Sequence, residues 1–150
     1  MRAVVQRVTS ATVAVDGIEH GRIGRGLLIL LGVGLGDQVE DADWLAGKLA
    51  RLRIFPDDAG LMNRSLVDIA GGLLAISQFT LFASTAKGNR PSYLAAAQPA
   101  EAEPLYRCFV ERLASVSQRP VATGVFGADM RVELVNDGPV TIVIDSRQRA

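Results

Sequence analysis

The stretch GLLILLGV, residues 26–33, is an almost unbroken run of apolar side chains. Such a run is typical of a β-strand that is buried on both faces. The segments before it, RAVVQRV (2–8) and the alternating ATVAVDG (11–17), predict two further strands. Asp16-Gly17 predicts a turn into IEHGRIG (18–24), a further strand segment. The first part of the chain therefore predicts a sheet built around residues 26–33.

Two later segments carry apolar residues at helical spacing. DADWLAGKLARLRIF (41–55) places Trp44, Leu45, Leu49 and Leu52 at this spacing, with acidic residues at its start and basic ones near its end, as the helix dipole favours. The turn residues 56–60 are expected to end this helix. A second helix is predicted from Glu101, with an apolar stripe formed by Leu105, Phe109, Leu113 and Val116.

The remaining segments complete a mixed architecture. GGLLAISQFTLFA (71–83) predicts another buried strand, and STAKGNRPS (84–92) predicts a loop. Near the end, two strands, MRVELV and TIVID, flank NDGPVT (136–141), where Asn-Asp-Gly is typical of a hairpin turn although Pro139 has no N–H to offer the returning strand. We expect one α+β (mixed α/β) domain over residues 1–150, with a curved, largely antiparallel sheet or partial barrel and helices packed on one side.

The composition excludes several classes of protein. Hydrophobic residues make up 49% of the chain, so a disordered protein is excluded. Sixteen basic and sixteen acidic residues cancel, which argues against a broad nucleic-acid-binding surface. The apolar run at residues 26–36 is too short and too rich in glycine to cross a bilayer. We therefore expect a soluble, cytoplasmic protein without membrane attachment, and its single cysteine excludes an internal disulfide.

The inventory of reactive side chains limits the chemistry. A serine or cysteine nucleophile is normally activated by a histidine, and the only histidine, His20, belongs to a turn-like EHG segment that is expected to be exposed. Cys108 lies among apolar residues of the second predicted helix and is expected to be a core residue. One cysteine and one histidine cannot build a zinc site, and the acidic run at residues 37–43 lacks calcium-loop spacing. We expect neither a metal nor a cofactor.

Two polar segments are candidates for a binding site. SQFTL, residues 77–81, places three polar side chains in a predicted apolar strand, where they either bond neighbouring backbone or line a pocket. KGNRPS, residues 87–92, is a local basic patch that suits phosphate groups, although the same composition is common in surface loops.

Taken together, these motifs resemble those of the D-aminoacyl-tRNA deacylase family. SQFTL, KGNRPS, FGADM (126–130) and LVNDGPVT (134–141) occur in the family's order, and MRAVVQRV, GLLILLGV, RIF and MNRS also match. Ser84 and Ala86 depart from the pattern, because many relatives carry an aspartate and a second basic residue in this loop, and Tyr93 stands where phenylalanine is common.

The resemblance implies a homodimeric esterase that acts without a cofactor. Its expected substrates are D-aminoacyl-tRNA and glycine mischarged on tRNA-Ala, cleaved at the 3′ end with help from the terminal ribose 2′-OH. By the same resemblance, the aminoacyl pocket is lined by Ser77, Gln78, Phe79 and Thr80. Further contacts with the tRNA end are expected from Phe126, Met130, Asn136, Lys87 and Arg90.

The resemblance also gives the Gly-Pro segment a role. Gly138 and Pro139 would form a Gly-cis-Pro motif that reaches into the active site of the other subunit and rejects L-aminoacyl groups, with Arg7 holding it. Cis bonds are rare even before proline, so the residues alone would predict trans. Two alternatives stay open: Thr80 as a covalent nucleophile, for which no base is evident, and a non-catalytic domain that binds tRNA 3′ ends.

Overall fold

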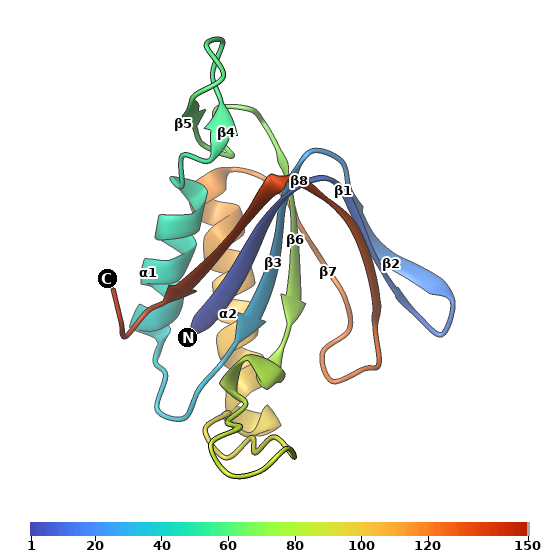
Figure 1. Ribbon diagram of the computed structural model, residues 1–150, viewed down its shortest axis with the longest axis vertical. Helices are drawn as coiled ribbons and strands as arrows, with labels where there is room; N and C mark the ends of the chain where they lie inside the picture. The colour runs from blue at the N-terminus through green and yellow to red at the C-terminus, as the bar shows by residue number, and fades with distance from the viewer. Residues whose placement is uncertain (150) are drawn as a thin grey trace.

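A strongly curved, mixed sheet forms the body of the molecule, and two helices cover one of its faces (Figure 1). The computed structural model describes residues 1–149. The main sheet has the order β2-β1-β3-β6-β7, with β8 paired to β1; its strands are β1 (Arg2–Val15), β2 (Ile18–Ile23), β3 (Gly26–Gly32), β6 (Gly72–Ser77), β7 (Val121–Thr123) and β8 (Arg131–Asp145). The helices are α1 (Val39–Ala50), α2 (Pro99–Ser117) and the short 3₁₀ helix η1 (Phe79–Phe82), and a small hairpin joins β4 (Phe55–Pro56) to β5 (Met62–Arg64).

Strand β1 organises the antiparallel part of the sheet. It pairs antiparallel with β2, β3 and β8, whereas β3, β6 and β7 run parallel to one another. The predicted α+β class, the curved sheet and the one-sided helices are confirmed. The two strands predicted for residues 2–17 are one strand of 14 residues, which turns at Asp16-Gly17 as expected.

Strand β3 is buried on both faces, as its sequence predicted. Leu27, Ile29 and Leu31 pack under the helices, in the larger hydrophobic core. Leu28 points to the opposite face, because successive side chains of a strand alternate, and it belongs to a second core that includes Val13. A strand whose alternate residues serve two cores has no polar face, which explains the unbroken apolar run.

The helices differ from the sequence prediction at their ends. Helix α1 ends at Ala50, five residues earlier than predicted, because Phe55 leaves the helix and pairs with Arg64 in the β4–β5 hairpin. In α2, Phe109 and Leu113 are buried as predicted, but Val116 is exposed. The buried stripe instead runs through Ala102, Tyr106, Phe109, Leu113 and Ser117. Within residues 1–149, neither helix is long and apolar enough to cross a membrane.

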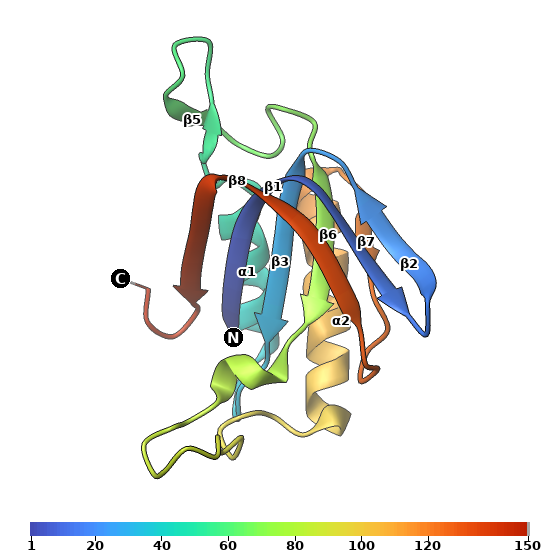
Figure 2. The same ribbon diagram turned by 45° about the vertical axis from the view of Figure 1, so that its right-hand side comes forward.

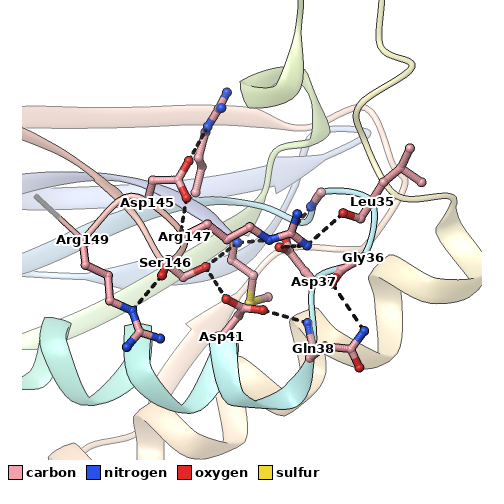
Figure 3. Close-up of polar contacts among 12 residues, drawn as sticks. Leu35, Gly36, Asp37, Gln38, Asp41, Asp145, Ser146, Arg147 and Arg149 are labelled. Carbon is pink, nitrogen blue, oxygen red and sulfur yellow. Dashed lines mark hydrogen bonds and ion pairs between the residues drawn. The ribbon is translucent and has the colours of Figure 1, made fainter.

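A buried ion pair ties the start of the chain to α1 and to the segment after β8 (Figure 3). The α-ammonium group of Met1 lies 2.9 Å from Oδ2 of Asp37, and both charged groups are at most 1% exposed. The same ammonium donates a 2.7 Å hydrogen bond to Oγ of Ser146. The Ser146 hydroxyl in turn donates to Asp41, and Arg147 pairs with the other oxygen of Asp37. Charge neutralisation and hydrogen bonding thus compensate the desolvation of both ions.

We predict that Asp37→Asn lowers the free energy of unfolding by about 3–5 kcal/mol, because it leaves the buried ammonium without a counter-ion. Urea denaturation of the purified variant measures the change. Asp43→Asn is the matched control, since Asp43 forms an exposed pair with Arg112, and it is expected to cost no more than about 1 kcal/mol. Equal losses in the two variants would contradict the role given to Asp37.

Candidate functional site

A pocket of about 570 Å³ opens at the carboxyl end of β6, between η1 and the start of α2. We call it the β6 pocket. Five residues named from the sequence line it, namely Ser77, Gln78, Phe79, Phe126 and Met130. Its other lining residues are mostly small or apolar. They come from β6, from the residue after β3, from the segment before α2, from α2 itself and from residues 127–132 at the start of β8. A concave, apolar site with a few polar groups is the usual form of a ligand pocket.

The SQFTL segment is not the continuous strand that the sequence predicted. Strand β6 ends at Ser77, and the chain turns at once into η1. Gln78 N–H donates to the carbonyl of Leu31 in β3, which is the last hydrogen bond between the backbone of this segment and a strand. The turn places the polar side chains at the end of the strand rather than within it.

This turn leaves two main-chain donors available. The first N–H groups of a helix have no partner inside it. In the described part of the chain, neither the N–H of Phe79 nor that of Thr80 donates a hydrogen bond. Two consecutive free donors beside a pocket can stabilise negative charge on a bound oxygen.

The side chain of Thr80 does not line the β6 pocket. Its hydroxyl accepts a hydrogen bond from Nε2 of Gln78. The one histidine, His20, is exposed on β2, as predicted. Among residues 1–149, no three His, Cys, Asp or Glu side chains cluster as metal ligands would.

Tyr106 of α2 supports strand β6 beside the pocket. The sequence did not identify it as a site residue. Its hydroxyl donates a 2.8 Å hydrogen bond to the carbonyl of Ala75 in β6, and its ring centroid lies 5.9 Å from that of Phe126. Burial raises the pKa of Tyr106 to about 12, so the hydroxyl stays protonated and remains a donor. Tyr106 lies four residues after Ala102 and three before Phe109, a spacing that places all three on one face of a helix. This spacing is the sequence signal that indicates its burial.

The segment around Pro139 is a bulge and not the predicted hairpin turn. Strand β8 runs antiparallel to β1 on both sides of it, with Asn136 opposite Val8 and Thr141 opposite Gln6. Four residues, 137–140, therefore face one residue of β1, Arg7. Because both halves of β8 pair with the same strand, the chain keeps its direction and the extra residues loop out. We call residues 137–140 the β8 bulge.

Two side chains hold the β8 bulge in place. Arg7 is 9% exposed and donates from Nε to the carbonyl of Asp137 at 3.2 Å and from Nη1 to that of Ile54 at 2.6 Å. Nδ2 of Asn136 donates to the carbonyls of Arg7 and Val140, both at 3.0 Å. Both amide protons of Asn136 are thereby used within the chain.

Gly138 and Pro139 are exposed at the tip of the bulge, and the bond between them is cis. Gly138 has a φ of +128°, and a Cβ there would come within 2.8 Å of Cγ2 of Val140 and 3.0 Å of Nη2 of Arg7. The sequence accounted for this glycine by the Asn-Asp-Gly turn signal and by the Gly-cis-Pro motif. In the structure, the packing of the bulge itself already requires it.

The bulge and the β6 pocket lie at opposite ends of the sheet within one chain. Arg7 pairs with Leu27 at the start of β3, whereas Ser77 pairs with Leu31 near its end, about 13 Å further along the strand. Figure 2 shows the same separation between the middle of β8 and η1. One protomer therefore does not bring Gly138 and Pro139 to Ser77.

Comparison with known proteins decides the family. The family model described as D-Tyr-tRNA(Tyr) deacylase matches residues 4–145. The D-aminoacyl-tRNA deacylase of Opitutus terrae is 62% identical to the chain over 149 residues, with 99% of each covered. That of Dechloromonas aromatica is 55% identical, with 98% of each covered. The chain belongs to the D-aminoacyl-tRNA deacylase family.

Two solved structures share the fold of this chain. The structure titled c-Myc DNA Unwinding Element Binding Protein superposes with a TM-score of 0.91 at 40% identity and covers 97% of the chain and 98% of its own. A structure described as a probable eukaryotic D-amino acid tRNA deacylase gives a TM-score of 0.78 at 17% identity, with coverage of 95% and 97%, and shows the shared fold alone.

Lys87 and Arg90, the basic residues noted in the sequence, lie outside the β6 pocket lining of this family member. Both are exposed in the loop of residues 85–91, whose ends are joined by two hydrogen bonds between the backbones of Ser84 and Ser92. They are free to contact a ligand that extends out of the pocket.

Proposed function

We propose that this protein hydrolyses the ester bond between a D-amino acid and the 3′ end of tRNA, and likewise removes glycine mischarged on tRNA-Ala. The observation that carries the proposal is the β6 pocket, lined by SQFTL and FGADM residues in a chain that belongs to the deacylase family. Its size and apolar walls suit an aminoacyl group together with a nucleobase.

In this mechanism the protein supplies main-chain donors rather than a titrating base. The N–H groups of Phe79 and Thr80 are expected to bind the carbonyl oxygen of the ester as negative charge develops on it, and each such donor is worth about 10²–10³ in kcat. A water oxygen adds to the carbonyl carbon, assisted by the ribose 2′-OH. The bond to the ribose 3′ oxygen then breaks, and that oxygen takes up the proton that the attacking water loses. Ser77 and Gln78 line the aminoacyl side, and Phe126 and Met130 flank the terminal adenosine.

Selection between D- and L-amino acids is proposed to require a second subunit. The β8 bulge is rigidly held, exposed and remote from its own pocket, so it is suited to enter the pocket of a second copy. Val143, Val4 and Leu30 lie side by side across β8, β1 and β3 on the face away from the helices, and Val143 is 70% exposed. An apolar row that is exposed at Val143 and half-buried at Val4 and Leu30 is expected to be covered in a dimer. Main-chain atoms of Gly138 and Pro139 would then occupy the space that an L-side chain needs.

The central test is deacylation of matched substrates. The purified protein is expected to release D-tyrosine from D-tyrosyl-tRNA and to leave L-tyrosyl-tRNA intact, because the proposed filter acts on the hand of the α-carbon. Release of radiolabelled amino acid measures both rates. Equal rates would refute the selectivity, and binding without turnover would favour the non-catalytic alternative.

A second experiment separates positioning by Thr80 from attack by Thr80. Thr80→Ala is expected to lose less than about tenfold in kcat, because its hydroxyl bonds Gln78 and lies outside the pocket lining. A tRNA that ends in 2′-deoxyadenosine is expected to react at least about a hundredfold more slowly. An inert Thr80→Ala enzyme that still binds substrate, or a trapped acyl-threonine, would instead make Thr80 the nucleophile.

A third experiment tests the shared site by complementation. Gly138→Ala displaces the bulge and Phe126→Ala damages the pocket, so each homodimer is expected to be impaired. Random mixing makes half of the dimers mixed, and one of their two sites contains both intact parts. About a quarter of wild-type activity should therefore return after co-expression. No recovery would exclude a site shared between subunits.

A further inference from the structure

An exposed aromatic pair stands at the mouth of the β6 pocket. Phe79 and Tyr93 both line the pocket, and their ring centroids lie 5.1 Å apart with an interplanar angle of 71°. Phe79 is 55% exposed and Tyr93 is 39% exposed, whereas Ile76 and Ala102 deeper in the same pocket are nearly buried. The pair therefore forms the rim and leaves ring surface open to solvent.

Both rings are carried by backbone that is anchored to the end of β3. On one side, Gln78 N–H donates to Leu31 and fixes the start of the turn that bears Phe79. On the other, Ala97 N–H donates to Val33, and Ala96 N–H closes a turn onto the carbonyl of Tyr93. Fixed rings lose little conformational entropy when a planar ligand stacks on them, so this pair is prepared for binding.

The surroundings of the pair favour a negatively charged ligand. The chain has no net charge, yet residues 69–100 contain two cations, Lys87 and Arg90, and no carboxylate. Residues 85–91, which include both cations, form the cationic loop. Ser92 pairs with Ser84 at the base of this loop and directly precedes Tyr93. The one charged side chain in the pocket lining is Asp129, in the segment after Phe126 rather than in the cationic loop. Aromatic rings beside basic side chains are the usual combination for single-stranded nucleic acid.

We propose that the Phe79–Tyr93 pair is a stacking platform for the base that precedes the 3′-terminal adenosine of the tRNA. The inference rests on the proposed function, which assigns the inner pocket to the terminal adenosine and the aminoacyl group. The chain of an RNA ligand that leaves the pocket passes the exposed rings, and its next phosphates come within reach of Lys87 and Arg90. Stacking is tolerant of base identity, so the platform suits a 3′ end shared by many tRNAs.

A second copy of the protein is the competing occupant of these rings. The charge distribution favours RNA, because the apolar row proposed for the dimer lies on β8, β1 and β3, whereas the rings adjoin a segment that carries only positive charge. Coverage of the rings by a second copy would overturn the proposal.

The test uses an RNA hairpin that carries no amino acid, with a single-stranded 3′ end and 2-aminopurine in place of the penultimate base. Binding to the full-length protein is expected to quench the fluorescence, because 2-aminopurine loses emission when it stacks. Tyr93→Ala is expected to abolish most of the quenching and to weaken binding by about 5- to 100-fold, the range found when a stacking ring is removed. Tyr93→Phe and Tyr93→Trp keep a ring and should restore both signals, which excludes misfolding as the cause.

Leu94→Ala is the matched control, since Leu94 is the next residue, is 85% exposed and does not line the pocket. It should leave quenching and affinity unchanged. Unaltered quenching in Tyr93→Ala would overturn the platform. The same conclusion would follow if Tyr93→Ala bound RNA normally but weakened the dimer in sedimentation experiments. Because the RNA carries no aminoacyl group, the result does not depend on turnover. Failure of the platform and failure of the deacylase proposal are therefore distinguishable.

Discussion

The burial of β3 on both faces is the constraint on which the rest of the molecule depends. One face packs under the helices and the other fills the curve of the sheet, so the position of this strand is fixed from both sides. The carbonyl of Leu31 in β3 accepts the N–H group of Gln78, and that of Val33, directly after the strand, accepts the N–H group of Ala97. Two walls of the β6 pocket are therefore hydrogen-bonded to a strand that is packed on both faces, which favours a fixed site geometry.

This rigidity matters because the proposed chemistry depends on backbone groups. A main-chain N–H cannot be tuned by its pKa, so its contribution comes entirely from where it is held. The abrupt end of β6 at Ser77 and the start of η1 create the free donors at Phe79 and Thr80. Tyr106 fixes the same strand from beneath through its hydrogen bond to Ala75. A catalyst of this type needs neither histidine nor metal, but it tolerates little movement of the strand end.

The β8 bulge shows how pairing overrides a local turn signal. Asn-Asp-Gly favours a reversal, yet β8 continues along β1 because its residues on both sides of the bulge find partners there. Arg7 and Asn136 then bond the looped-out carbonyls. The result is an exposed, well-held projection, a form better suited to entering a neighbouring subunit than a mobile hairpin tip would be.

The sequence alone determined the two long helices, the strands around β3, the double burial of β3, the exposure of His20 and, through its ordered motifs, the family. These features depend on local patterns, which any chain with these residues must express. It also named five residues that line the β6 pocket, although it placed Gln78 and Thr80 in a strand. Only the tertiary structure decided where β6 ends, that residues 137–140 form a bulge, and that Tyr106 and Tyr93 belong to the site. Each of these depends on contacts between residues far apart in the chain, such as Gln78 with Leu31 or Asn136 with Arg7, and no local pattern encodes such a pairing.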